Sequence, residues 1–260
     1  MSKNINRHNN AVSYSVSQNF LTSPKIINRL LRMTTICDDD YVIEIGAGKG
    51  HITRELAKIC QKVNAFEVDS KLFVQLQKFF ENTQNIKLNC CDFLKATLPK
   101  RGSYKVFSNI PFSITSDVIR KLTSFSNPPQ EAWLIMEKGA AKRFIGNPYD
   151  TLASLLLKPF YNTKIIYHFS RQDFHPAPSV DVVLVHISKR TEPEIPFKQH
   201  KSYHNFVEKS HKYGIYRQLS KRKITTALRI ARLPHIKESS TILYIQWLCL
   251  FRCYRQLYGG

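Results

Sequence analysis

The chain has 260 residues, of which 43% are hydrophobic, and its 39 Lys and Arg outnumber 19 Asp and Glu, giving a formal net charge of +20. This hydrophobic content is enough for a packed core and excludes a wholly disordered chain. No stretch reaches the ~18 consecutive apolar residues of a membrane span, and the polar N-terminus lacks the apolar run of a signal peptide. We therefore expect a soluble, cytoplasmic protein with no membrane partner.

The positive charge is densest near the C-terminus. Residues 189–260 contain 15 Lys and Arg against 4 Asp and Glu, a net charge of +11, whereas residues 1–188 contain 24 against 15, a net charge of +9. An excess of this size favours a polyanionic partner over a generically basic surface, and we expect that partner to be nucleic acid.

In chain order, residues 1–15 are predicted to be a flexible basic arm, and Pro24 after Ser23 predicts the start of a helix over 24–35. Period-2 and period-3.6 hydrophobic patterns then alternate. The predicted strands are 41–46, 62–69, 86–93, 104–112, 131–138, 164–170 and 180–188, the last two forming a hairpin. The predicted helices between them are 51–60, 70–82 with Ser70 as its cap, 113–125 and 151–160. This alternation predicts an α/β fold of Rossmann-like type, with a mostly parallel seven-stranded sheet covered by helices on both faces.

A linker rich in Pro and Glu, RTEPEIP at 190–196, predicts a domain boundary. The predicted catalytic domain is therefore 1–189, followed by a small, basic, all-α domain at 190–260. Its predicted helices are 198–213, 217–233 and 239–257.

The sequence EIGAGKG, from Glu44 to Gly50, follows a strand and opens a helix. Glycines there allow a sharp turn and a close approach of the backbone to a ligand. Glu67 lies 21 residues after Gly46, where an acid accepts hydrogen bonds from ribose hydroxyls. The spacing GxGxG differs from the GxGxxG of pyrophosphate binders and favours S-adenosylmethionine over NAD or FAD. A nicotinamide oxidoreductase and a turn without a ligand remain alternatives.

Two further motifs end predicted strands. Asp92, within Cys-Asp-Phe, either accepts from an adenine amine or caps a turn. In Asn109-Ile110-Pro111-Phe112, an amide oxygen and a backbone carbonyl are suited to accept both hydrogens of an exocyclic amine, and Phe112 offers a face for stacking a base. Two such acceptors favour pyramidalisation of the nitrogen and expose its lone pair to a methyl donor, without a strong base. A strand that simply ends at a proline turn is the alternative.

Together these motifs resemble those of the ribosomal RNA adenine N6-dimethyltransferases, the Erm and KsgA family. The resemblance spans essentially the whole chain and rests on SQNFL at 17–21, EIGAGKG, Glu67, Asp92, NIPF and FHPAPSV at 174–180. SQNFL, NIPF and the EKGAAKRF segment resemble the Erm branch. That branch uses S-adenosylmethionine to mono- or dimethylate N6 of one adenine in the peptidyl-transferase loop of 23S ribosomal RNA, before full ribosome assembly. The resemblance thus implies macrolide, lincosamide and streptogramin B resistance, and a monomeric enzyme.

The resemblance also implies a cofactor site. Asn19 and Leu21 would contact the methionine part of the cofactor, Glu67 the ribose, and Val68 and Asp92 the adenine. The full implied set is Asn19, Leu21, Gly46, Glu67, Val68, Asp92 and Asn109. No metal is expected, because the six cysteines show no CxxC pair and no zinc-finger spacing; we expect buried free thiols.

The implied catalytic residues are Asn109, Ile110, Phe112 and Phe174. Asn109 would lie between cofactor and target amine, Phe112 would stack on the flipped adenine, and Phe174 would form the opposite wall. Flipping the base costs a few kcal/mol, which phosphate contacts would offset. The candidate phosphate contacts are Lys3, Arg7, Lys138, Lys142, Arg143, Arg217, Lys221, Arg222 and Lys223.

Two readings within the same fold stay open at this point. One is a small-subunit enzyme that performs the same chemistry on 16S ribosomal RNA. The other is a non-catalytic nucleic-acid-binding protein of the transcription-factor type, against which the intact NIPF motif argues.

Overall fold

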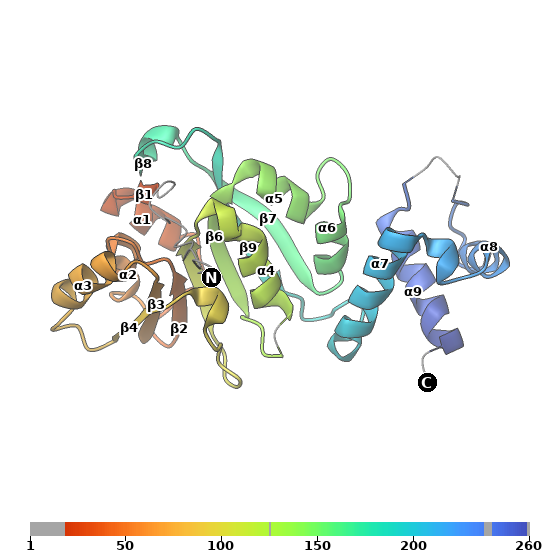
Figure 1. Cartoon of the computed structure of the whole chain (residues 1–260), viewed down its shortest axis with the longest axis horizontal. Helices are drawn as coiled ribbons and strands as arrows, with labels where there is room; N and C mark the ends of the chain where they lie inside the picture. The colour runs from red at the N-terminus through yellow and green to blue at the C-terminus, as the bar shows by residue number, and fades with distance from the viewer. Residues whose placement is uncertain (1–18, 125, 237–240, 259–260) are drawn as a thin grey trace, which may run out of the picture.

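A computed structural model of the chain describes residues 19–258, except 125 and 237–240. Its centre is a seven-stranded sheet with the order β4-β3-β2-β5-β6-β9-β7 (Figure 1). The first five strands in this order are parallel, and β9 runs antiparallel between β6 and β7. The strands are β2 Tyr41–Ile45, β3 Lys62–Glu67, β4 Ile86–Cys90, β5 Lys105–Asn109, β6 Glu131–Glu137, β7 Tyr161–His168 and β9 Val182–Lys189.

The inner strands β2, β3, β5, β6 and β9 are buried on both sides, so alternate residues enter two different hydrophobic clusters. Val42 of β2 packs with helices α1 to α3, whereas the adjacent Ile43 packs with α4 to α6. The result is a three-layer α/β fold, which confirms the predicted class. The helices are α1 Pro24–Leu31, α2 His51–Leu56, α3 Ser70–Phe79, α4 Thr115–Ser124, α5 Lys138–Ile145 and α6 Leu152–Leu157.

The differences from the sequence prediction include a helix cap and an additional helix. The cap of α3 is Asp69 and not Ser70, because Oδ1 of Asp69 accepts from the backbone N–H groups of Lys71 (2.8 Å) and Leu72 (3.3 Å). Helix α5 was not predicted; it begins directly where β6 ends, at Lys138, with no capping side chain to mark it.

A two-stranded ribbon joins distant parts of the chain. Strand β1, Phe20–Leu21, pairs antiparallel with β8, Phe174–His175, so that Leu21 faces Phe174. The predicted hairpin of β7 and β9 is confirmed, and β8 lies in the segment that connects its strands.

Three helices follow the sheet: α7 His200–Tyr213, α8 Lys221–Ile230 and α9 Tyr244–Tyr258. They extend from one end of the sheet layer (Figure 1). Their hydrophobic cluster is continuous with that of α4 to α6. Tyr203 of α7 is central to this contact: its ring lies 5.9 Å from Phe160 and 5.2 Å from Phe251, and its hydroxyl donates to the Leu155 carbonyl at 3.0 Å.

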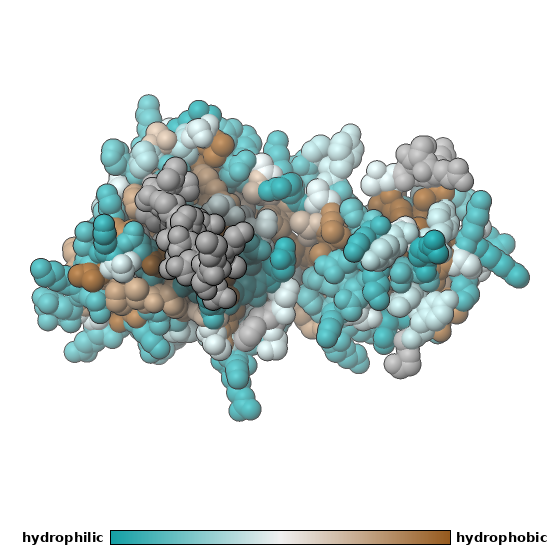
Figure 2. Space-filling view, viewed as in Figure 1, coloured by the Kyte–Doolittle hydropathy of each residue, from teal (hydrophilic) through white to brown (hydrophobic). Residues whose placement is uncertain are grey.

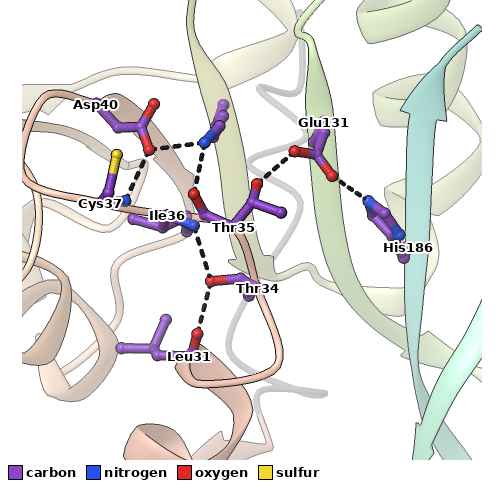
Figure 3. A network of polar contacts seen from close by, with 9 residues as sticks. Leu31, Thr34, Thr35, Ile36, Cys37, Asp40, Glu131 and His186 are labelled. Carbon is purple, nitrogen blue, oxygen red and sulfur yellow. Dashed lines mark hydrogen bonds and ion pairs between the residues drawn. The ribbon is translucent and has the colours of Figure 1, made fainter.

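A polar network closes the edge of the sheet where the parallel strands begin (Figure 3). Glu131 accepts from the Thr35 hydroxyl with one carboxylate oxygen and contacts Nε2 of His186 at 2.7 Å with the other. The Lys105 ammonium donates to the Thr35 carbonyl at 2.7 Å and to Asp40 at 2.8 Å. The loop between α1 and β2 is thereby fixed to β5, β6 and β9.

Candidate active site

The candidate site lies where the parallel strands end, at the point where the strand order reverses between β2 and β5. Ligands of open α/β sheets bind outside the carboxyl ends of the strands at this reversal. Gly46 follows β2 and Asn109 ends β5. A cleft at this edge is lined by Ile45, Gly46, Phe66, Val68, Cys91, Asp92, Phe93, Leu94, Pro111 and Ile114.

The glycine loop is held closely against its neighbours. The N–H groups of Gly46 and Ala47 both donate to the Phe66 carbonyl, at 2.8 and 2.9 Å. Gly48 has a φ of +57°, and an added Cβ would lie 2.7 Å from the Phe20 ring. Phe20 thus covers the loop, and the Lys49 ammonium lies 4.9 Å from its ring centroid. Sequence reasoning did not assign Phe20 a role, although it is part of the SQNFL motif.

Glu67 is 3% exposed and is fixed by two backbone donors. Its Oε2 accepts from Gly48 N–H at 2.7 Å and its Oε1 from Asp69 N–H at 2.9 Å. Each carboxylate oxygen has a second lone pair. The structure therefore orients this carboxylate at the end of β3, beside the glycine loop.

A second acid, Glu44, is buried beneath the loop and was not predicted as a site residue. Burial, with a smaller contribution from the neighbouring Glu67, raises the pKa of its carboxyl to about 8, although a hydrogen bond from the Thr53 hydroxyl at 2.6 Å opposes the shift. At neutral pH Glu44 is thus mostly uncharged.

Asp92 and Val68 lie on the same cleft. One oxygen of Asp92 caps a short turn, accepting from Leu94 N–H at 2.8 Å. The other oxygen bonds to no donor within the described part of the chain. Val68 is 41% exposed and contributes an apolar wall. Asp92 therefore caps a turn, and its second oxygen stays available as an acceptor at the cleft.

Asn109 is oriented by the β1 segment. Its Nδ2 donates to the Asn19 carbonyl at 2.8 Å, which assigns the amide so that Oδ1 is the free end. No donor in the described residues bonds to this Oδ1. Pro111 packs near Gly46, with its Cδ 3.7 Å from the position of an added Cβ. The NIPF turn and the glycine loop are therefore neighbours, as the motif analysis requires.

The remaining catalytic candidates differ in exposure. Phe112 is half-buried at the start of a 3-10 turn, and Ile110 is buried. Phe174 is 4% exposed, and its ring lies 5.1 Å from Phe169 within the hydrophobic core. The structure therefore places Phe174 inside the core instead of at an open wall. Leu21, its partner in the ribbon, is also buried, so its side chain packs in the core with Phe174.

The predicted RNA contacts fall into separate groups. Lys3 and Arg7 lie outside the described residues. On α5, Lys142 and Arg143 are exposed, whereas the Lys138 ammonium lies 3.5 Å from the Asp181 carboxylate. Arg217, Lys221 and Arg222 are exposed near α8, and Figure 1 shows α6 and α7 between them and α5.

Lys223 differs from its basic neighbours. Its ammonium lies 5.0 Å from the Tyr258 ring centroid and donates to the Tyr258 hydroxyl at 3.2 Å. Together with Arg222 it borders a groove between α8 and α9 that is also lined by Ile230, Ile245 and Leu257. Hydrophobic residues gather beside the loop that joins these helices (Figure 2). The basic cluster thus borders an apolar groove and is not a uniformly charged surface.

The cysteine prediction was only partly right. Cys60 is buried, but Cys37, Cys90 and Cys91 are exposed, and all six are free thiols. Across the described ranges, no group of three or more His, Cys, Asp or Glu is arranged to hold a metal ion. No helix in the same ranges is long and apolar enough to cross a membrane.

The sheet order, the glycine loop and the acceptors at the strand ends define a Rossmann-like methyltransferase. Residues 8–250 match the family model described as "Ribosomal RNA adenine dimethylase". The chain therefore belongs to the ribosomal RNA adenine dimethylase family, and it is an rRNA adenine N6-methyltransferase.

Individual relatives support this placement. The rRNA adenine N-6-methyltransferase of Limosilactobacillus reuteri is 38% identical over 239 residues, which cover 92% of this chain and 95% of the relative. That of Lysinibacillus sphaericus is 35% identical over 250 residues, covering 96% and 100%. Among solved structures, the 23S rRNA methyltransferase ErmE superposes with a TM-score of 0.77 at 25% identity, over 92% of this chain and all of ErmE.

Proposed function

We propose that the protein transfers methyl groups from S-adenosylmethionine to N6 of one adenine in the peptidyl-transferase loop of 23S ribosomal RNA. The product would be mono- or dimethyladenine, and the cell would gain resistance to macrolides, lincosamides and streptogramin B. We further propose that it acts in the cytoplasm, as a monomer, on RNA not yet fully assembled into ribosomes.

The residues of the cleft fit this cofactor. Asp92 keeps a free acceptor suited to an adenine amine, and Val68 offers an apolar wall for the ring. The Glu67 carboxylate, fixed by two N–H groups, keeps lone pairs suited to ribose hydroxyls. Asn19 and Gly46 lie toward the NIPF turn, where we propose that the methionine end binds. When bound, S-adenosylmethionine supplies an electrophilic methyl group.

The observation that supports the chemistry most directly is the hydrogen bond from Asn109 to Asn19. With Nδ2 committed to the Asn19 carbonyl, Oδ1 is held as a preorganised acceptor. We propose that Oδ1 and the Ile110 carbonyl accept the two hydrogens of the adenine amine, and that Phe112 stacks on the base. The nitrogen lone pair then points away from both acceptors, toward the methyl group.

The choice of 23S over 16S RNA is supported by the likeness to ErmE at 25% identity and a TM-score of 0.77. A dimethyladenosine transferase from Plasmodium falciparum shares the fold with a TM-score of 0.65 at 21% identity, which gives no argument about the substrate. We propose that residues 190–260, together with α5, hold the RNA by phosphate contacts.

The test is expression of the wild type and of Asn109→Ala in a macrolide-sensitive bacterium. Primer extension on the cellular RNA should stop at one adenine of 23S RNA with the wild type only, and only the wild type should confer resistance. A stop in 16S RNA and none in 23S RNA would instead assign the small-subunit reaction. Absence of methyl transfer to any RNA by the pure protein would favour a non-catalytic binding role.

A further inference from the structure

Beyond these sites, the exposed surface of α1 is unusually basic. Lys25, Arg29 and Arg32 follow at intervals of four and three residues, so they share one side of the helix. The opposite side, with Ile27, Leu30 and Leu31, is buried in the core. Within the described residues, no carboxylate oxygen lies within 4 Å of the charged nitrogens of the three cations.

Helix α2 and the turn that follows it extend this basic surface. Arg54 and Lys58 are tied to α1 through Glu55, whose Oε2 accepts from Lys58 at 2.8 Å and from Asn28 of α1 at 3.1 Å. Arg54 contacts the other oxygen of Glu55 at 3.0 Å. The carboxylate of Glu55 is thus already bonded to its own neighbours and leaves the α1 cations without a counter-ion. We call the five cations Lys25, Arg29, Arg32, Arg54 and Lys58 the α1–α2 basic face.

Helix stability does not account for these charges. Cations in the last turn of a helix complement its dipole, which explains Arg29 and Arg32 in part. Lys25, however, is in the first turn, where a positive charge opposes the dipole and where α1 has no acidic residue. Lys25 is therefore unfavourable for the stability of α1.

The Arg29 guanidinium is positioned by an aromatic ring. Its guanidinium lies 5.5 Å from the Tyr167 ring centroid. A guanidinium stacked on an aromatic ring keeps its N–H donors free at the edge, where they match the oxygens of a phosphate. Lys25, Asn28, Arg29 and Arg32 line a hollow on this surface.

The position of the face relates it to the reaction. Lys25 is six residues after Asn19, whose carbonyl holds Asn109. Even a fully extended chain of that length spans only about 20 Å. Lys25 to Arg32 covers about 10 Å of helix. Three steps of one nucleic-acid strand cover a similar length along a duplex axis, at ~3.4 Å per phosphate.

We propose that the α1–α2 basic face binds the phosphate backbone of the RNA next to the target adenine. This inference rests on the proposed function for the identity of the RNA. The face is separate from α5 and from the C-terminal helices, and it binds phosphate without reading the base sequence.

The test compares two triple variants in binding to a transcript that contains the peptidyl-transferase loop of 23S RNA. Lys25→Gln/Arg29→Gln/Arg32→Gln removes three cations of the face. Lys71→Gln/Lys78→Gln/Lys87→Gln removes three exposed lysines of α3 and β4 and is the charge-matched control.

For the first variant, the slope of log K against log salt should fall by about 2 to 3, as expected for three lost phosphate contacts. For the control it should fall by less than about 1. The KM for RNA should rise with the loss of affinity, whereas kcat at saturating RNA and the Kd for S-adenosylmethionine stay within about twofold. A third variant that keeps the charge and leaves Arg29 in place, Lys25→Arg/Arg32→Lys, should bind like the wild type.

Equal losses in the first variant and the control, or wild-type binding by the first variant, would overturn the proposal. Weak binding by the charge-preserving variant would also overturn it. Binding is measured independently of methylation. A wild type that binds the transcript but methylates no RNA would contradict the proposed function, while the comparison of salt slopes would still decide the role of the face.

Discussion

The two edges of the central sheet both hold polar side chains, but they use them differently. Where the parallel strands begin, one carboxylate oxygen of Glu131 accepts from the Thr35 hydroxyl and the other contacts His186 (Figure 3). Where they end, the Asn109 amide N–H donates to the Asn19 carbonyl, and one oxygen of Asp92 accepts from Leu94 N–H. Within the described residues, each of these two side chains keeps an oxygen that accepts from no donor. At the first edge the carboxylate oxygens of Glu131 both have partners within the protein. At the second edge the side chains are oriented by one hydrogen bond each and still have an acceptor available for a ligand.

This difference shows how a polar cluster for stability can be told from one for chemistry. Buried polar groups are normally satisfied within the protein. A group that is held rigidly by one hydrogen bond, yet keeps a second acceptor at a cleft, can complete its bonding with a ligand. Substitutions at the two edges should therefore change different quantities, activity at one and stability at the other.

The largest effect is expected for Asn109→Ala. Loss of one preorganised polar group costs about 10²–10³ in rate, so methyl transfer should fall by at least this factor while RNA and cofactor binding persist. Asn127→Ala is the matched control, because within the described residues the Asn127 side-chain amide donates to the carbonyls of Pro99 and Gly102 and to no other group. It should lower the free energy of unfolding by about 1–2 kcal/mol and leave kcat unchanged. Equal kcat values for the two variants would contradict the distinction.

The second prediction concerns the pH dependence of stability through Glu44. Its folded-state pKa of about 8 lies above the ordinary carboxyl value of 4.5. The unfolded chain therefore releases this proton first, so stability is present below pH ~4.5 and is lost as the pH rises toward 8, at up to ~1.4 kcal/mol per unit. Glu44→Gln cannot ionise and should be more stable than the wild type by a few kcal/mol at pH 8. Urea unfolding at pH 5 and pH 8 measures this, and a variant with an unchanged pH dependence would contradict it.

A smaller effect is expected for Phe112→Ala. Loss of base stacking should cost ~1–3 kcal/mol in kcat/KM for RNA. Phe112→Tyr keeps the ring and should retain most of the activity. Steady-state methyl transfer with a defined transcript measures both variants, and wild-type activity of Phe112→Ala would exclude this ring from the base site.

The smallest effect is expected at the opposite edge. Thr35→Val removes the hydroxyl that Glu131 accepts from and should lower the free energy of unfolding by about 1 kcal/mol. Methyl transfer should remain at the wild-type rate. A loss of activity without a loss of stability would show that the two edges are coupled.

Much of this arrangement follows from local sequence pattern. Apart from α5 and β8, the strands and helices from β2 to β9 have clear hydrophobic periods, and their order brings Gly46 and Asn109 to the reversal of the sheet. Helix α5 escaped prediction because it starts without a capping side chain. The cap of α3 was placed one residue late, since Asp69 and Ser70 are both good caps and the choice depends on backbone geometry.

Long-range contacts could not be predicted from the sequence for a different reason. The ribbon of β1 and β8 consists of two-residue strands separated by more than a hundred residues, and such short segments have no detectable period. The motif placed Phe174 at the base site, but its burial depends on packing against Phe169 and Leu21. Likewise, no pattern in the sequence indicates that the Asn19 carbonyl orients Asn109.

The hydrophobic cluster shared by the sheet and the last three helices has a consequence for protein engineering. Tyr203 contacts Phe160 on one side and Phe251 on the other. Removing the C-terminal helices would therefore expose aromatic and aliphatic side chains around Phe160 to solvent. We expect heat to melt both parts in one calorimetric transition. In a chimera that takes these helices from a relative, the residues of the sheet layer that face Tyr203, such as Phe160, would have to come from the same relative.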